Sequence, residues 1–411
     1  MIVLDNLEKK ILEKIENMKG DIIKFLQELI RIPSEVPPAK YRQISKFVAE
    51  KMEEIGIKTQ IKRNNVIGEI GVETGTGPSL ILYGHMDTVP TFTGWKKDPY
   101  GGEVINNKIY GRGAADDKCC IAGVIFAVKA LKELGVNLNG KLILTAVVNE
   151  EIGGIQGIEY LLEKGYIKGD ACLLGDVYCD YPTGYLGGGF FIRFIINGIL
   201  KHLEEFPDLP LPNRNKYSGI NAINKMIPIM NFLTELQEEF KNIETKFPLH
   251  PDLPCKISTI NLAIIKGGKS HTTVPDKCIL QCFVNTIPEQ DVEILKARVL
   301  DYIEDLKKND PDLNIDVNVA RIFKPHIIDV NSNFAKVVKN VYKSVYGEER
   351  EFKLYTPITD AQSFIEKGIE TILIGAIHGD SNIHAIDEFV YIEDVINITK
   401  IYALTAMKYL K

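Results

Sequence analysis

The chain has 411 residues, of which 45% are hydrophobic, 25% charged and 9% aromatic, and its formal net charge is −6. Because this length exceeds what one hydrophobic core supports, we expect two domains. The net charge is negative, and the sequence has no run of basic residues interleaved with aromatic ones. Both features argue against nucleic-acid binding. No stretch approaches the roughly 20 apolar residues of a membrane-spanning helix, so the composition predicts a soluble, cytoplasmic protein with no nucleic-acid or membrane partner.

The amino-terminal region is predicted to be helical. Residues 1–10 mix acidic and basic side chains without the apolar core that a signal peptide requires. Apolar residues then recur at helical spacing over residues 5–18, 21–32 and 41–55. This spacing predicts three amphipathic helices before the first buried strand.

A nearly continuous apolar strand leads into the first motif that suggests chemistry. Residues 79–83 are predicted to form a buried strand, and Gly84-His85-Met86-Asp87 follows where the strand runs into a loop. His85 and Asp87 are two residues apart, so in an extended backbone they project to the same side. A metal ligand and a carboxylate that orients it fit this spacing, and so does an ordinary turn or helix cap.

Three later strands of the same kind also end near residue types that bind metals. Strand patterns at 141–148, 171–174 and 371–377 alternate with helical patterns, which indicates a mainly parallel sheet with helices on both faces. The carboxyl ends of parallel strands gather at one edge of a sheet, where ligands bind. The candidates at this edge are His85, Asp87, Asp116, Asp117, Glu150, Glu151, Asp176 and His384.

Imidazole and carboxylate groups without thiolates suit zinc, manganese or cobalt in a hydrolytic centre. Two histidines and several carboxylates suffice for two metals that share a carboxylate, roughly 3.5–4 Å apart, with a hydroxide between them. Each residue taken singly has an ordinary explanation: Asp116 or Asp117 as a helix N-cap, Glu150 and Glu151 as exposed acids, and His384 as a surface histidine. Together, at several strand ends, they favour a metal centre.

The region 185–323 has a different pattern. Its order of strand, helix, strand, strand, helix and strand is that of a ferredoxin-like α+β unit. We therefore expect residues 1–184 and 324–411 to form one catalytic domain into which 185–323 is inserted. The seven cysteines form no paired C-x-x-C array and are expected to be buried free thiols, in preference to disulfides or a structural zinc site.

Four motifs resemble those of one family of co-catalytic di-zinc metallopeptidases and deacylases. They are LYGHMDTVP at 82–90, YGRGAADDK at 110–118, NEEIGG at 149–154 and HAIDE at 384–388. The family includes succinyl-diaminopimelate desuccinylase, acetylornithine deacetylase, aminoacylase and glutamate carboxypeptidase, and the match follows the family's order over nearly the whole chain. The resemblance implies a zinc-peptidase-like fold and an amidohydrolase that cleaves an N-acyl amino acid or a short peptide.

The resemblance also implies metal ligands. His85 and Asp176 would bind one zinc ion, Glu151 and His384 the other, and Asp116 would bridge the two ions. Cobalt or manganese could replace zinc.

Three further residues receive roles by the same resemblance. Glu150 would be the general base, and Asp87 would fix the His85 ring. The segment GILKH at 198–202 is similar to a family segment whose histidine reaches the active site of a neighbouring subunit and helps to stabilise the oxyanion. His202 would then act in trans, and the insert would be both a lid and the interface of a homodimer.

Departures from the family pattern concern the substrate. Asn285 stands where many members have an arginine that binds the substrate carboxylate, and it brings no charge. Asp176 stands where the family's deacylases usually have glutamate and its aminopeptidases and dipeptidases have aspartate. Residues 204–216 look like an insertion after His202. A dipeptidase or aminopeptidase therefore stays open beside a deacylase, as does a non-catalytic metal-binding or regulatory protein on this fold.

Overall fold

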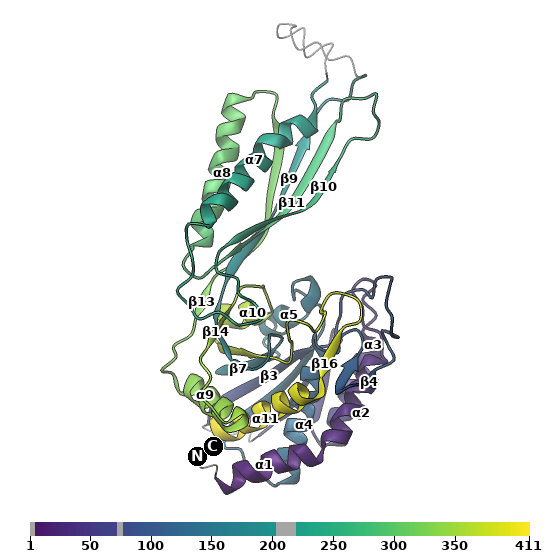
Figure 1. Cartoon of the computed structure of the whole chain (residues 1–411), viewed down its shortest axis with the longest axis vertical. Coiled ribbons are helices and arrows are strands. Elements are labelled where there is room, and N and C mark those ends of the chain that lie inside the picture. Colours follow the sequence, from purple (N-terminus) through teal and green to yellow (C-terminus); the bar gives the residue numbers. More distant parts are fainter. Residues whose placement is uncertain (1–4, 72–76, 203–218) are drawn as a thin grey trace.

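The computed structural model describes residues 5–71, 77–202 and 219–411, so the whole of the expected insertion at 204–216 lies outside the described residues. The main body contains a nine-stranded sheet in the order β1-β2-β6-β3-β7-β15-β8-β13, with β14 paired to β8 (Figure 1). The strands are β1 (Lys58–Lys62), β2 (Asn65–Ile70), β3 (Ser79–His85), β6 (Lys141–Val147), β7 (Ala171–Gly175), β8 (Thr183–Leu186), β13 (His326–Ile327), β14 (Lys353–Tyr355) and β15 (Glu370–Ile374).

The four central strands β6, β3, β7 and β15 run parallel to one another. Their side chains alternate between two hydrophobic cores: Leu80 and Leu82 of β3 belong to one core, and Ile81 and Tyr83 to the other. Both faces of these strands are therefore buried, as their continuous apolar sequences predict. The antiparallel pairs lie toward the two edges, at β1-β2, β2-β6, β15-β8 and β8-β13.

Helices cover both faces of this sheet. The first core is closed by α1 (Asn6–Asn17), α2 (Lys19–Ile30), α3 (Arg42–Glu54), α4 (Lys118–Glu133), α9 (Asn333–Tyr346) and α11 (Ile392–Tyr409). The second core is closed by α5 (Ile158–Glu163) and α10 (Ala361–Glu366). The predicted fold class, a mainly parallel sheet with helices on both faces, is confirmed. No helix in the described ranges is long and apolar enough to span a membrane.

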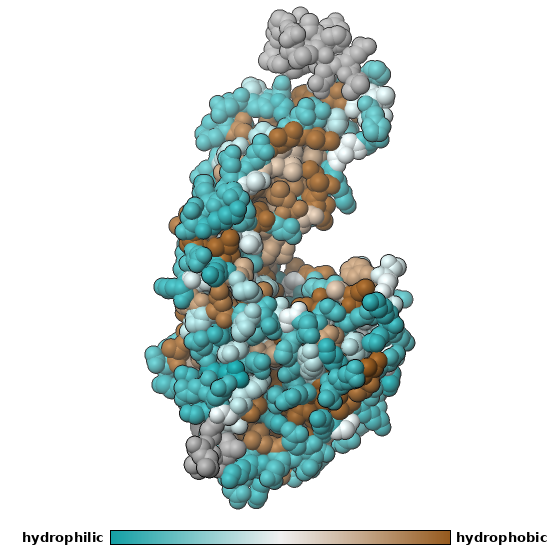
Figure 2. Space-filling model, viewed as in Figure 1, coloured by the Kyte–Doolittle hydropathy of each residue, from teal (hydrophilic) through white to brown (hydrophobic). Residues whose placement is uncertain are grey.

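A second unit projects from the main body, and Figure 2 shows a hollow between the two. Its four strands are ordered β10-β11-β9-β12, and all three strand pairs are antiparallel. Buried residues of its two helices and its strands form a separate core. Its elements are β9 (Gly188–Asn197), α7 (Ala222–Phe240), β10 (Thr259–Gly267), β11 (Lys277–Thr286), α8 (Val292–Asn309) and β12 (Asn314–Phe323).

A small third sheet brings two distant loops together. It has the order β16-β5-β4, from β4 (Glu103–Ile105), β5 (Lys108–Tyr110) and β16 (Phe389–Tyr391). Phe389 of β16 pairs with Tyr110 of β5, and the N–H of Gly111 donates to the carbonyl of Glu388 at 2.9 Å. The loop that follows β5 therefore lies beside the loop that precedes β16, at the edge where the parallel strands end.

Candidate metal centre

Three neighbouring parallel strands deliver acidic and histidine side chains to one edge of the sheet. His85 is the last residue of β3. Glu150 and Glu151 begin the short 3₁₀ helix η1 (Glu150–Ile152) that follows β6, and Asp176 directly follows β7. Because β6, β3 and β7 are adjacent and parallel, they end at the same edge of the sheet, and the residues that follow them lie close together.

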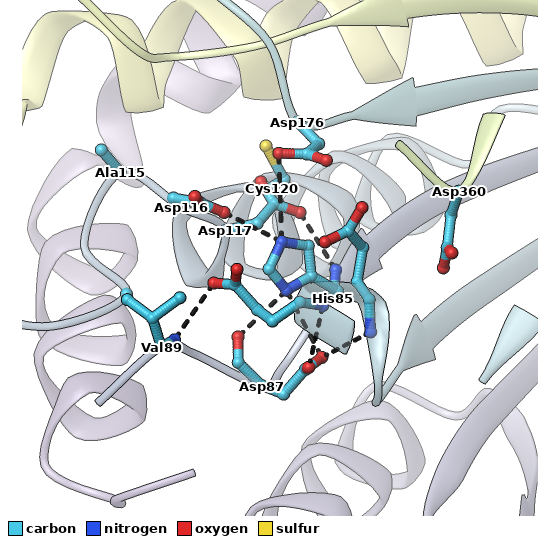
Figure 3. A network of polar contacts seen from close by, with 12 residues as sticks. His85, Asp87, Val89, Ala115, Asp116, Asp117, Cys120, Asp176 and Asp360 are labelled. Carbon is cyan, nitrogen blue, oxygen red and sulfur yellow. Dashed lines mark hydrogen bonds and ion pairs between the residues drawn. The ribbon is translucent and has the colours of Figure 1, made fainter. Parts of the chain in front are cut away.

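Asp116 lies between two histidines. Its Oδ1 is 2.9 Å from Nε2 of His85, and its Oδ2 is 3.0 Å from Nε2 of His384. The same His384 nitrogen is 3.0 Å from Oε2 of Glu151. Oδ1 of Asp176 is 3.9 Å from Nε2 of His85 (Figure 3). Two groups of ligand-type atoms result, His85-Asp116-Asp176 and Asp116-Glu151-His384, and within each group all the atoms lie within 4.8 Å of one another.

The donor atoms of these two groups fit divalent metal ions. Both groups contain one imidazole and two carboxylates, and the Asp116 carboxylate is the member they share, as a bridge between two ions requires. The side chain of His85 is fully buried and that of Asp116 is 8% exposed, so both are shielded from bulk water. His384, at 53% exposed, lies on the open side of the cluster.

Asp87 connects the two halves of the cluster. Its Oδ1 and Oδ2 accept the backbone N–H groups of Glu150 and Glu151, both at 3.2 Å. The Nδ1 atom of His85 is 3.0 Å from the backbone carbonyl of Asp87 and 3.5 Å from its Oδ1. The resemblance predicts that the Asp87 carboxylate orients His85, but in the structure the Asp87 carbonyl is the closer partner. Either contact leaves Nε2 of His85 facing Asp116.

Burial and crowding shift the pKa values in this cluster. Burial raises the pKa of Glu150 well above its usual range, against the opposing charge of His85, and the nearby acid Asp360 raises it further. Burial also raises the pKa of Asp176, with Glu150 adding to the effect. For Asp116, burial acts upward, but its hydrogen bonds with His384 and His85 lower the pKa overall. The carboxylates therefore need positive charge nearby in order to ionise together.

The loop that carries Asp116 is held by a buried acid that the sequence analysis did not single out. Oε1 of Glu388 accepts the N–H groups of Ala115 at 3.0 Å and Asp116 at 3.2 Å. Its Oε2 lies 2.6 Å from Nη1 of Arg112, and both side chains of this ion pair are 1% exposed. Glu388 is the last residue of the HAIDE motif, which is the signal that could have found it.

Replacing Glu388 is expected to destabilise the fold. Glu388→Gln leaves the Arg112 guanidinium buried without its counter-charge, so we expect the free energy of unfolding to fall by about 3–5 kcal/mol. Denaturant unfolding monitored by circular dichroism measures this change. Glu239→Gln is the control, because Glu239 pairs with Arg298 on an exposed surface and its loss should cost at most about 1 kcal/mol. Equal effects of the two changes would contradict this role of Glu388.

Two other residues, Asp360 and His202, lie on opposite sides of the prediction: one adjoins the cluster and the other is remote from it. Asp360, which the sequence analysis missed, precedes α10, and its Oδ2 accepts the hydroxyl of buried Tyr83 at 2.7 Å. His202 lies beyond the distal end of β9, is exposed, and pairs with Thr273 in an isolated bridge. The structure therefore brings together the five proposed ligands, Glu150 and Asp87, and places His202 apart from them in the second unit.

Comparisons with known proteins show the family to which this chain belongs. Residues 81–408 match the model of Peptidase family M20/M25/M40. N-formyl-4-amino-5-aminomethyl-2-methylpyrimidine deformylase of Bacillus subtilis (strain 168) is 28% identical over 415 residues, which cover 95% of this chain and 94% of that protein. The probable succinyl-diaminopimelate desuccinylase of Staphylococcus aureus (strain MSSA476) is 27% identical over 378 residues, covering 86% of this chain and 88% of that protein.

Solved structures show the same fold. The dipeptidase Dug1p from Saccharomyces cerevisiae superposes with a TM-score of 0.77, covers 98% of both chains and is 19% identical. The resemblance that the sequence motifs carry is confirmed, because the family model spans most of the chain. This protein therefore belongs to peptidase family M20/M25/M40 and is a hydrolase of amide bonds.

Proposed function

We propose that this protein is a two-metal amidohydrolase that removes a small acyl group from an N-acyl amino acid or a related amine. The observation that carries the proposal is the Asp116 carboxylate, which is shared between two ligand groups that each contain a histidine. His85 and Asp176 would hold one ion and Glu151 and His384 the other, most suitably Zn²⁺, with Co²⁺ or Mn²⁺ as alternatives. Such a pair of ions, when bound, polarises a carbonyl and activates water at neutral pH.

Glu150 is the general base of this proposal. It is the neighbour of the ligand Glu151, and the N–H groups of both residues are fixed by the Asp87 carboxylate, so its backbone has a defined position beside the cluster. Burial raises the pKa of its carboxyl, which makes the carboxylate a stronger proton acceptor. Glu150 takes the proton of the attacking water and transfers it to the leaving amine.

A residue of the second unit, Asn285, bears on the class of substrate. Asn285, near the end of β11, pairs with Gly189 of β9 and supplies an uncharged amide at the position where many family members have an arginine. Its Oδ1 is buried and has no hydrogen-bond partner in the described part of the chain. We infer a preference for small, uncharged acyl groups, in line with the deformylase relative. Asp176, the residue type of the family's dipeptidases, is the observation that favours a short peptide instead.

A substrate panel tests the proposal and separates the two candidates. The metal-loaded enzyme is assayed by amine release from N-formyl, N-acetyl and N-succinyl amino acids, an N-formyl aminomethylpyrimidine and dipeptides. The deacylase proposal predicts the highest kcat/KM on a formyl or acetyl substrate, with loss of activity after chelation and recovery after metal is restored. Dipeptides as the best substrates would support the peptidase candidate. Activity that survives complete metal removal would contradict both.

A homodimer through the second unit is part of the proposal. His202 follows the end of β9 in the second unit, and its proposed oxyanion role would be carried out at the active site of a partner subunit. Apolar side chains gather on this unit (Figure 2), and along the edge strand β10 Leu262, Ile264 and Ile265 are 37–53% exposed. An exposed, apolar edge strand is suited to pairing with a second copy.

Disrupting this edge is expected to separate the subunits. Ile265→Lys introduces a charge on β10, so we expect sedimentation velocity to shift from dimer to monomer and kcat to fall, because His202 would no longer reach a partner's site. Ile294→Lys is the control, since Ile294 is 67% exposed on α8, away from this edge. A wild-type monomer with full activity would contradict the dimer and the role of His202 together.

A further inference from the structure

A second group of ligand-type side chains lies outside the centre described above. Sγ of Cys179 is 3.1 Å from Nε2 of His378, and Oδ2 of Asp394 is 2.8 Å from the same nitrogen. All three ligand atoms lie within 4.8 Å of one another. Cys179 is 1% and Asp394 7% exposed, so a thiol and a carboxyl group are both buried against one imidazole.

Three segments that are distant in the sequence form this group. The backbone pairing of β7 and β15 continues past both strands, with the N–H of Cys179 donating to the carbonyl of Ile377 at 2.8 Å. This pairing brings Cys179 beside His378. Asp394 lies in the first turn of α11, which begins at Ile392. The ligand atoms therefore converge because of the tertiary fold.

The two contacts of this group depend on one ring nitrogen of His378. The Nε2 atom of an imidazole carries either one N–H or one lone pair, so Cys179 and Asp394 compete for a single bond to His378. A divalent ion removes the competition, because it binds a thiolate, a neutral imidazole nitrogen and a carboxylate oxygen at once. A tetrahedral zinc ion holds its ligand atoms roughly 3.3–3.8 Å apart, so shifts of less than about 1 Å would admit it.

The surroundings of His378 support the same conclusion. Oδ2 of Asp252 lies 3.9 Å from Nδ1 of His378, the nitrogen that faces away from the thiol, and it accepts the N–H of Gly379 at 3.1 Å. Metal-binding histidines commonly donate their second ring N–H to a carboxylate, and a shift of about 1 Å would bring Asp252 within hydrogen-bond distance of His378. His378 and Asp394 also line a cavity of about 820 Å³, together with Asp180 and Tyr346. The cavity would give an ion a route to the group, and three protein ligands would leave a fourth coordination position for water.

We propose that Cys179, His378 and Asp394 bind a third divalent metal ion, best suited to Zn²⁺, at a site separate from the two-metal centre. Mixed sulfur, nitrogen and oxygen ligands favour zinc over magnesium or calcium, which prefer oxygen alone. The ion would join the ends of β7 and β15 to the start of α11. Through Asp252 it would also fix the segment between α7 and β10. This proposal does not depend on the substrate or on the mechanism at the first centre.

Cobalt substitution tests the proposal, because the two-metal centre contains no thiolate. The full chain is loaded with Co²⁺ and its near-ultraviolet spectrum is recorded, with metal content measured per chain. We expect a thiolate-to-cobalt charge-transfer band and one bound metal more than the first centre holds. Cys179→Ser should abolish the band and remove one metal per chain. Cys255→Ser, which changes a half-buried cysteine elsewhere in the chain, should leave both unchanged.

Two further variants distinguish loss of the metal ion from misfolding of Cys179→Ser. His378 is 30% exposed, so His378→Gln should fold, lose the band and lose one metal, while its circular dichroism spectrum stays unchanged. His384→Ala, at the first centre, should keep the band. The absence of a thiolate band in the loaded wild-type protein would overturn the proposal. A band that persists in a folded Cys179→Ser or His378→Gln protein would do so as well.

Discussion

Glu150→Gln is expected to lower kcat by roughly 10²- to 10⁴-fold, the usual contribution of a general base. The substitution keeps the size of the side chain and removes its ability to accept a proton from water. Because Glu150 is not one of the proposed ligands, both metal ions should stay bound and KM should change little. Steady-state kinetics on the best substrate of the panel, with metal analysis of the same preparation, measures these quantities.

Glu151→Gln is the matched control for this experiment. The two residues are adjacent, and both have backbone N–H groups held by Asp87, but Oε2 of Glu151 lies 3.0 Å from Nε2 of His384. Glu151→Gln should therefore weaken metal binding and lose activity through metal loss, with partial recovery at high metal concentration. Full kcat in metal-loaded Glu150→Gln would exclude Glu150 as the base.

Asp116→Ala is expected to have the second large effect. This carboxylate is the one group shared by both ligand sets, and its two oxygens face two different histidines. Its loss should weaken both ions at once, so we expect less than the full metal content and a fall in kcat/KM of about 10³-fold or more. This corresponds to the several kcal/mol of charge stabilisation that such metals supply.

Asp117→Asn is the control that separates the bridging role of Asp116 from a general effect of negative charge on metal binding. Asp117 is adjacent and also buried, but its Oδ2 accepts the backbone N–H of His85 at 3.0 Å and it belongs to neither ligand group of the centre. The change removes the same charge and preserves the shape of the side chain. We expect Asp117→Asn to retain both metals. If Asp116→Ala retained both metals and Asp117→Asn lost them, the assignment of the bridge would be wrong.

Much of the fold could be predicted because its central strands are buried on both faces. The continuous apolar runs of β3, β6 and β7 are clear signals, and the polar residues at their ends follow from the parallel arrangement. The strand predicted at 371–377 ends earlier, at Ile374, and the next residue, Gly375, lies against the backbone of Val177. A Cβ atom there would be 1.6 Å from the Val177 carbonyl oxygen, a contact that only the tertiary structure reveals.

Other features depend on contacts between distant segments and gave no local signal. The two- to four-residue strands β8, β13 and β14 are too short to produce a periodic pattern. The spacing of the cysteines argued for buried free thiols; six of the seven are buried and Cys255 is half-buried. That spacing could not reveal that Cys179 meets His378 and Asp394, because the meeting depends on the pairing of β7 with β15. The hydrogen bond from Tyr83 to Asp360 spans 277 residues and was missed for the same reason.

The most direct test of the central claim is a crystal structure of the zinc-loaded protein with anomalous scattering data collected at the zinc edge. The two-metal proposal predicts two anomalous peaks beside Asp116, roughly 3.5–4 Å apart. One should contact His85 and Asp176, and the other Glu151 and His384. A single peak at this position in protein that is fully active, or two peaks without contact to Asp116, would contradict the proposal.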